Sequence, residues 1–318
     1  MRAHITDKTH IAPMIECGIT SPCKRSAIEE YRDCRFRAEI DSIGIKIRTL
    51  KPTNFYTVRN RLEAPYVETF DEGSGGAASE FHIKFYSLKN WQEIDRALEK
   101  LTHDHPLAGP VEVTSIEIAL DTYSKLHDRE ALVMMVAKFY CGLTKPISVN
   151  QRITPGEKYS AKAIPSFAIL LRKIRAGENI YIGNKDPKED LDNPQSWMMQ
   201  HFYLKQTDRK MPLPVHEQRA RVEITLKGIA LPHKFLDEWR SHQFTEEGEY
   251  FKFRKPKTDL TCLEKIVFIA KSQYGAKKQK RSGPKRTIYS PLTLADIPLN
   301  NKAYDALRNL TNRLKGGR

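Results

Sequence analysis

His201, Tyr203 and Lys205 alternate along one stretch of the chain, and their types define the chemistry to look for. A tyrosine hydroxyl is a weak nucleophile with an ordinary pKa of about 10, so it attacks a phosphodiester only with help. A metal ion that polarises the phosphate and a cation that stabilises the phenolate both supply such help. The stretch therefore predicts phosphoryl chemistry at Tyr203, and the alternative is a tyrosine that only packs.

The elements that carry these side chains are predicted to be β-strands. Residues 200–205 alternate strictly, with Phe202 and Leu204 on the packed face, which is the period of a half-buried strand. Residues 115–121 and 221–227 show the same alternation of apolar with polar or charged positions. Three strands of this kind predict a sheet with one packed face and one open face, and the open face is the working surface.

Acidic residues on the two other strands are candidates for holding a divalent ion. Glu117 and Asp121 share one strand, and Glu223 lies on the other. Carboxylate oxygens are hard ligands, which favour Mg²⁺ or Mn²⁺. Because Glu117 and Asp121 stand about 13 Å apart along a strand, one ion is not expected to take both directly. We expect Glu117 with Glu223 as the ligand pair and Asp121 as second choice; the alternative is ordinary salt bridges to Arg221 or Lys227.

The overall charge indicates a polyanionic partner. Lysines and arginines number 53 against 39 acidic residues, which gives a formal net charge of +14 and a pI near 9.4. Such an excess predicts nucleic acid first and an anionic membrane surface second, and the alternative is a basic protein without such a partner. Because no stretch approaches the ~18 apolar residues of a membrane span, we expect no membrane partner.

Cysteine usage and the first residues of the sequence indicate a compartment. The five cysteines are scattered and odd in number, which is not typical of a disulfide framework. The first residues, Met-Arg-Ala-His-Ile-Thr-Asp-Lys, lack the apolar core of a secretory signal. We therefore expect a reduced, cytoplasmic protein.

The hydrophobic periodicity predicts an α+β fold, with a mainly antiparallel sheet, helices packed on one face and a C-terminal helical extension. Further strands are expected at residues 43–48, 81–86 and 179–183, and helices at 90–101, 128–140, 235–239, 260–272 and 301–314. We expect three regions, namely an irregular N-terminal lead-in (1–36), a catalytic domain (37–234) and a basic C-terminal helical region (235–318).

Two stretches that look like known motifs are discounted. Residues 103–105 (His-Asp-His) have the outline of the paired-histidine metal site of some DNA-nicking enzymes, but the central Asp and the following Pro106 predict a loop. Residues 216–219 (His-Glu-Gln-Arg) have the spacing of a tyrosine-recombinase motif. They follow Pro214 and lead into a strand, with no helix around them.

Four segments in register carry a family resemblance. They are residues 116–121 (Ile-Glu-Ile-Ala-Leu-Asp), 179–184 (Asn-Ile-Tyr-Ile-Gly-Asn), 202–210 (Phe-Tyr-Leu-Lys-Gln-Thr-Asp-Arg-Lys) and 221–227 (Arg-Val-Glu-Ile-Thr-Leu-Lys). Their order and spacing resemble the trans-acting rolling-circle replication initiator (Rep) family of plasmids, filamentous phages and integrative elements. The resemblance covers about residues 80–232. The acidic strand more often has Asp where Glu117 stands, and Arg or Asp often flanks the family's tyrosine where His201 and Leu204 stand here.

The resemblance implies an enzyme that nicks and rejoins origin DNA through a tyrosine linked to the 5′ phosphate, leaving a 3′ hydroxyl as primer. Carried over, Tyr203 is the nucleophile, Glu117 and Glu223 are metal-ligand candidates, and Lys205 lies near the phosphate. His201 is an extra base or ligand. The family acts with a host helicase and often as a dimer, so both partners are implied. The cations expected to contact DNA are Arg221, Lys227, Arg209, Lys210, Lys277, Lys278, Lys280, Arg281, Lys285 and Arg286.

Two other classes of protein stay open on the sequence alone. One is a DNA-binding regulator or inactive initiator homologue that keeps the charge and the sheet without using Tyr203. The other is an RNA-binding protein that stacks bases on Tyr181, Phe202 and Tyr203, although these do not all share a face. The basic run at 277–286 is either a phosphate-binding segment or a solvated linker. The enzyme hypothesis requires the Tyr203 hydroxyl to lie within about 10 Å of an acidic side chain.

Overall fold

A computed structural model describes most of the chain. The described residues are 31–62, 67–71, 77–143, 151–154, 164, 167–183, 192, 194–208, 210–257 and 293–316. Most of the expected lead-in, Arg209, the expected helix at 260–272 and the basic run at 277–286 lie outside these ranges.

Within these ranges, eight strands form one antiparallel sheet in the order β2-β3-β1-β4-β10-β7-β6-β5. The strands are β1 (Cys34–Asn54), β2 (Val67–Asp71), β3 (Ala77–Leu88), β4 (Glu112–Ser124), β5 (Gln151–Thr154), β6 (Asn179–Gly183), β7 (Met198–Lys205) and β10 (Arg219–Lys227). Two small pairs lie apart from the sheet, β8 (Thr207–Asp208) with β9 (Met211–Pro212), and β11 (Arg254–Pro256) with β12 (Thr293–Ala295). The α+β fold is confirmed.

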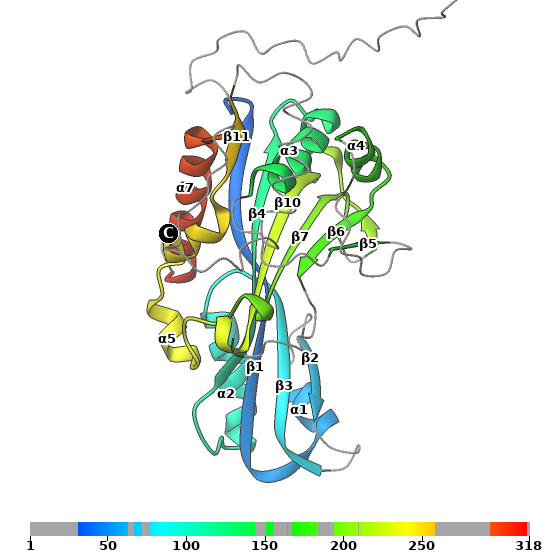
Figure 1. The fold of residues 1–318 in the computed structure, drawn as a ribbon. Helices are drawn as coiled ribbons and strands as arrows, with labels where there is room; N and C mark the ends of the chain where they lie inside the picture. Colours follow the sequence, from blue (N-terminus) through cyan, green and yellow to red (C-terminus); the bar gives the residue numbers. More distant parts are fainter. Residues whose placement is uncertain are drawn as a thin grey trace, which may run out of the picture.

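Strand β1 is the longest of these strands and runs through the whole length of the molecule (Figure 1). It pairs with β4 from Cys34 to Lys46 and with β3 from Ile40 to Asn54, so it connects β2 and β3 to the rest of the sheet. Its register with β4 shifts between Ile40 and Ser42, which places a β-bulge at Asp41. A bulge re-aims the side chain beside it, and this one lies next to the polar cluster described below.

One face of the sheet carries the hydrophobic core. Ile118, Phe202, Val222 and Ile224 are fully buried there, at alternate positions of three neighbouring strands. Alternation sends their sequence neighbours to the other face, as the period of two predicts. Phe202 and Leu204 therefore pack while Tyr203 faces away from the core, which confirms the predicted facing of this strand.

Helices cover the packed face. Among them, α3 (Arg129–Gly142) contacts β4, β7 and β10, α4 (Phe167–Arg175) contacts β7, and α7 (Ile297–Leu314) contacts β1. The other described helices are α1 (Phe55–Leu62), α2 (Gln92–Asp104) and α5 (Leu236–Ser241), and the 3₁₀ turns are η1 (Pro194–Trp197), η2 (Val215–Glu217), η3 (Gly228–Ala230) and η4 (Phe244–Phe251). Asp128 is the N-cap of helix α3, where its carboxylate accepts from the backbone N–H groups of Glu130 and Ala131. From this helix Tyr140 packs edge-on against Phe202, with ring centroids 5.5 Å apart.

The described C-terminal elements join the same core. Phe253 packs against Phe139 of α3, and the buried apolar residues of α7 belong to the hydrophobic core cluster. The fully buried Asp296 caps α7 and also accepts from the Tyr31 hydroxyl at 2.9 Å, while Lys138 of α3 contacts it at 3.1 Å. In the described residues, the region after 234 therefore extends the fold and does not form a core of its own.

Element boundaries differ from the sequence predictions mainly at the ends. Residues 34–36 belong to β1 and not to the lead-in, and α2 continues to Asp104, so His103 lies in its last turn. None of the helices in the described residues combines the length and the apolar composition that crossing a membrane requires.

Gly183 provides a test of the β6–β7 pairing. Its φ is +110°, and a Cβ there would meet the backbone carbonyl oxygen of Met198 on β7 at 2.5 Å. We expect Gly183→Ala to lower the free energy of unfolding by about 2–4 kcal/mol in urea denaturation. Gly109→Ala is the control, because a methyl group at that position would meet nothing within 4 Å. Equal stability of the two variants would contradict this pairing geometry.

Candidate active site on the open face of the sheet

The Tyr203 hydroxyl lies beside a carboxylate, as the enzyme hypothesis requires. It donates a hydrogen bond of 2.7 Å to Glu223 Oε1. The second oxygen of the same carboxylate lies 2.6 Å from His201 Nδ1. His201 and Glu223 are register partners across β7 and β10, and Tyr203 follows His201 by two residues on the same face. The antiparallel pairing thus presents one carboxylate to both an imidazole and a phenol.

Arg221 stands opposite Tyr203 in the register of β7 and β10 and is fully buried. Its guanidinium makes a bidentate pair with Asp121, at 2.6 and 2.7 Å, and contacts Glu223 Oε1 at 3.2 Å. It also donates to Glu39 and Asp41 on β1. Burial works against the charge, but these carboxylates, Asp121 foremost, hold the pKa of Arg221 well above its usual value. One cation therefore ties β1, β4 and β10 together.

Two of these carboxylates, Glu39 and Asp41, were not selected from the sequence. Glu39 stands opposite Ala119 in the register, and Asp41 occupies the bulge. Asp41 also lies 3.7 Å from Lys205 Nζ, which contacts Asp208 at 3.2 Å. Period-two spacing of the two acids was a signal in the sequence, but the pairing of β1 with β4 that places them here is a long-range contact.

The pKa values of Glu223 and Tyr203, which share a hydrogen bond, are shifted in opposite directions. Burial alone would raise the pKa of Glu223, but His201, Arg221 and the Tyr203 hydrogen bond together lower it to about 2. Burial, followed by the charge of Glu223, raises the pKa of Tyr203 well above its ordinary value. In this arrangement the phenol is neutral and the carboxylate is ionised.

Glu117 differs from Glu223 in its partners. Its two oxygens accept hydrogen bonds from the hydroxyls of Ser42 and Thr225, both at 3.0 Å. Burial raises the pKa of Glu117, and the charges of Glu223 and Asp41 raise it further. The ionised form is therefore disfavoured at Glu117, whereas it is favoured at Glu223.

The carboxylates of Glu117 and Glu223 fit a divalent ion in their chemistry. They are hard oxygen donors on diagonal positions of neighbouring strands, because Glu117 pairs with Thr225. Both Glu223 oxygens already contact Tyr203, Arg221 or His201, so an ion bound there would displace one of these contacts. Among the described residues, no three His, Cys, Asp or Glu side chains are placed to hold a metal. Mg²⁺ commonly binds through one or two carboxylates plus water and phosphate oxygens, so a pair of ligands is sufficient for this kind of site.

The structure corrects two of the expected roles. Asp121 is fully buried, with both oxygens taken by Arg221 and one also 3.2 Å from Arg219, so it is not placed to bind an ion. Arg221 is equally buried and faces carboxylates, so it does not reach a DNA phosphate. Asp121 and Arg221 instead form a buried salt bridge with each other, which was the alternative to metal binding by Asp121.

Two of the other expected DNA contacts, Lys227 and Lys210, are among the described residues. Lys227 ends β10, opposite Ser115 and four residues from Glu223. Lys210 is exposed in the turn between β8 and β9, with φ +67°. Arg209, Lys277, Lys278, Lys280, Arg281, Lys285 and Arg286 are outside the described residues.

Two polar residues of β6 contact His201, although the sequence did not indicate them as site residues. Asn179 Oδ1 lies 3.0 Å from His201 Nε2, and the Tyr181 ring stacks on the His201 ring. Tyr181 and His201 are register partners, which the sequence of either strand alone does not show.

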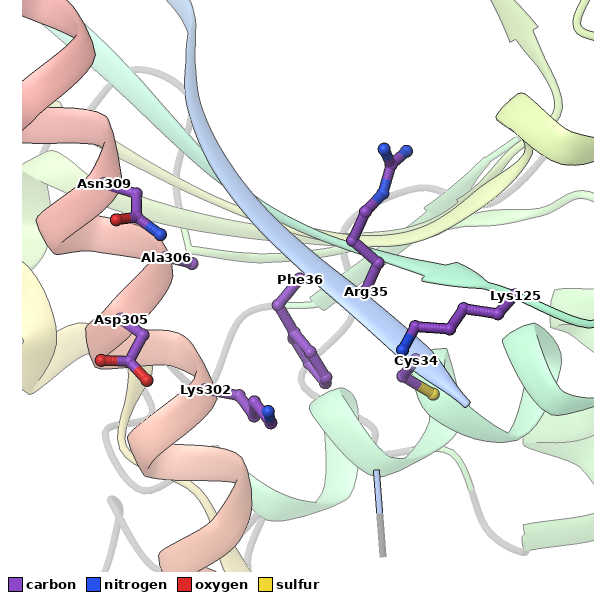
Figure 2. A pocket seen from close by; sticks show the side chains of 8 residues that line it. All are labelled: Cys34, Arg35, Phe36, Lys125, Lys302, Asp305, Ala306 and Asn309. Carbon is purple, nitrogen blue, oxygen red and sulfur yellow. The ribbon is translucent and has the colours of Figure 1, made fainter. Parts of the chain in front are cut away.

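A separate hollow of about 250 Å³ lies between the start of β1 and helix α7 (Figure 2). Its wall includes Cys34, Lys125 and Lys302, and none of its residues belongs to the Tyr203 cluster. Burial, and then the charge of Asp33, raises the pKa of the Cys34 thiol, so this cysteine is a poor nucleophile. The sheet face is therefore the better candidate for chemistry.

No protein-family model matches the chain, and no curated protein shows significant sequence similarity to it. Its function is therefore inferred from the geometry of the sheet face.

Arg221→Met tests the buried cation. The change leaves the carboxylates of Asp121, Glu39, Asp41 and Glu223 close together without their shared partner. We expect the free energy of unfolding at pH 7 to fall by about 3–5 kcal/mol. The control is Arg308→Met, which removes one exposed ion pair and should cost less than about 1 kcal/mol. A loss as small as that of the control would contradict the central role of Arg221.

Two glutamine substitutions should change stability in opposite directions at pH 7. The lowered pKa of Glu223 means that its ionised form stabilises the fold above pH 4.5, and this stability is lost as pH falls toward 2. Glu223→Gln should therefore cost about 3 kcal/mol at pH 7 and little at pH 2. The pKa of Glu117 is raised, so its effect on stability is the opposite. Its protonated form stabilises the fold, and this stability is lost as pH rises through the pKa that Glu117 has in the folded protein. Glu117→Gln should therefore be stabilising at pH 7. Thermal unfolding across this pH range measures both, and the same sign for both at pH 7 would contradict these assignments.

Proposed function

We propose that this protein is a rolling-circle replication initiator that nicks and rejoins origin DNA through Tyr203. The observation that carries the proposal is the Tyr203 hydroxyl, which lies outside the core and 2.7 Å from the Glu223 carboxylate. His201 contacts the same carboxylate, and Lys205 follows on the same strand. The family resemblance and the net charge of +14 support the same substrate class.

The reaction is a transesterification in which bonds and protons balance. The Tyr203 oxygen forms a bond to the scissile phosphorus, and the bond from phosphorus to the 3′ oxygen breaks. The products are a 5′-phosphotyrosine and a DNA strand with a free 3′ hydroxyl. The phenolic proton passes to Glu223, the departing 3′ oxygen takes a proton from water, and Glu223 returns its proton to the hydroxide that this leaves. Rejoining is the same reaction in reverse.

Proton transfer is the step that the local charges oppose. Glu223 accepts the hydrogen bond of the phenol, so its carboxylate is the group positioned to take the proton. Its low pKa makes it a weak base while Arg221 and His201 contact it. Bound substrate must therefore make Glu223 a stronger base or the phenol a stronger acid. One way to do so is for Lys205 to move from Asp41 and Asp208 toward the phosphate.

Mg²⁺ or Mn²⁺ is part of the proposal, with Glu117 and Glu223 as the residues that would hold it. Such an ion supplies positive charge that polarises a phosphate oxygen and opposes the carboxylate charge beside Tyr203. The raised pKa of Glu117, caused by burial and by its acidic neighbours, supports affinity for a cation on this side of the cluster.

DNA is expected to extend beyond the cluster along the basic residues. Lys210 and Lys227, with Arg209 and the basic run at 277–286, would supply sequence-independent phosphate contacts whose strength falls with salt. The host helicase, the homodimer and the cytoplasmic location implied by the sequence belong to the same proposal.

A nicking assay with Tyr203→Phe tests the proposed function. The substrate is supercoiled plasmid that carries the DNA surrounding the protein's coding sequence, with Mg²⁺ or Mn²⁺. We expect wild-type protein to give nicked plasmid with protein linked to its 5′ end. We expect Tyr203→Phe to lose at least about 10³-fold in rate while binding the same DNA. Tyr304→Phe on α7 is the control, because this tyrosine is exposed and outside the site.

The same assay separates the enzyme from the second class of protein. A DNA-binding regulator would shift the DNA in a gel without nicking it, and Tyr203→Phe would leave that shift unchanged. A covalent adduct that persists in Tyr203→Phe would instead assign the nucleophile to another residue.

A further inference from the structure

Three rings form a continuous stack on the open face of β6 and β7. The centroids of Tyr181 and His201 are 4.0 Å apart with 11° between the planes, and those of His201 and Tyr203 are 4.1 Å apart with 19°. Strand pairing explains the first contact, because Tyr181 and His201 are register partners. The second joins residues two apart on one strand, which share a face. The proposed nucleophile is thus the end of a three-ring stack.

His201 is held at its edges as well as on its faces. One ring nitrogen lies 2.6 Å from Glu223 Oε2, and the other lies 3.0 Å from Asn179 Oδ1. Glu223 Oε1 in turn accepts from the Tyr203 hydroxyl. The His201 imidazole therefore contacts Tyr203 directly by ring stacking and is also linked to its hydroxyl through the Glu223 carboxylate, which both side chains contact.

We propose that Tyr181 and Asn179 are positioning residues for the Tyr203 nucleophile and that they act through His201. This inference rests on the proposed nicking function. Tyr203 reaches an attacking geometry only if its ring plane and its hydroxyl are both fixed, and a displacement of about 1 Å can cost about 10²-fold in rate. The stack fixes the plane, and the His201–Glu223 contact fixes the acceptor of the hydroxyl.

Packing alone does not account for these two side chains. Ile180 lies between them in sequence and is fully buried, so it is the member of β6 that contributes to the core. Asn179 and Tyr181 are half-buried on the opposite face. A structural role would reduce stability and leave the rate of the folded protein unchanged, whereas a positioning role lowers kcat at constant KM.

The first experiment replaces the outer ring of the stack. Tyr181→Leu removes the ring, and Tyr181→Phe keeps it without the hydroxyl. We expect kcat for nicking to fall by roughly 10- to 100-fold in Tyr181→Leu, with KM within about 2-fold of wild type, and to stay near wild type in Tyr181→Phe. Wild-type kcat in Tyr181→Leu, or an equal loss in both variants, would overturn the role assigned to the ring.

The second experiment tests the hydrogen bond at the other edge of His201. Asn179→Ala removes the oxygen that faces Nε2, and Asn179→Asp keeps an oxygen at that place. We expect Asn179→Ala to lower kcat and Asn179→Asp to recover most of the loss. Equal rates in both variants and wild type would overturn the role of Asn179.

A measurement without DNA reports the stack itself. Ring currents of two flanking phenols should move the ring-proton NMR signals of His201 upfield, and Tyr181→Leu should move them part of the way back. The His201→Gln variant identifies these signals. An unchanged His201 signal in Tyr181→Leu would overturn the inference.

The outcomes distinguish this inference from the function on which it rests. If wild-type protein forms no adduct with DNA, the proposed function and the positioning role fall together, even where the NMR signals report the stack. If the adduct forms and Tyr181→Leu cleaves at the wild-type rate, only the positioning role falls.

Discussion

The arrangement of the open face depends on one buried guanidinium. Arg221 is inaccessible to solvent and contacts carboxylates on β1 and β4 and on its own strand, β10. Removing such a group from water is costly, and the cost is offset only when close opposite charges surround it. The same contact lets several carboxylates approach each other on adjacent strands, where they would otherwise repel. The order of the strands, the bulge at Asp41 and the position of Glu223 all bring carboxylates within contact of Arg221.

Arg221 also influences the charge state of Glu223, the carboxylate that contacts Tyr203. This carboxylate is shared by a guanidinium, an imidazole and a phenol, so its charge is stabilised and the Tyr203 hydroxyl remains protonated. A phenol that stays protonated is a poor nucleophile. In the proposed function, activation then depends on charges that the DNA phosphate and a divalent ion bring to the cluster.

The site is built on strands, and the core on their other face keeps those strands in place. Phe202 and Val222 are fully buried beside the residues that form the site, and α3 packs over them. Helix α7, from the far end of the chain, is joined to α3 through the Asp296–Lys138 ion pair. Polar groups on paired strands are held more closely than groups on loops, which suits a reaction whose rate depends on alignment.

The sequence by itself determined the faces of the strands, because a period of two is a local property. Alternation put His201, Tyr203 and Glu223 on one face and Phe202 on the other, and the structure agrees, although His201 and Glu223 are themselves buried on their face. Only the tertiary structure decided what these residues meet. Glu39 and Asp41 reach Arg221 through the pairing and bulge of β1, and Tyr181 reaches His201 through the β6–β7 register. The expectation that Arg221 faces DNA failed for the same reason, since the alternation places a side chain on a face but burial depends on the strands that pair beside it.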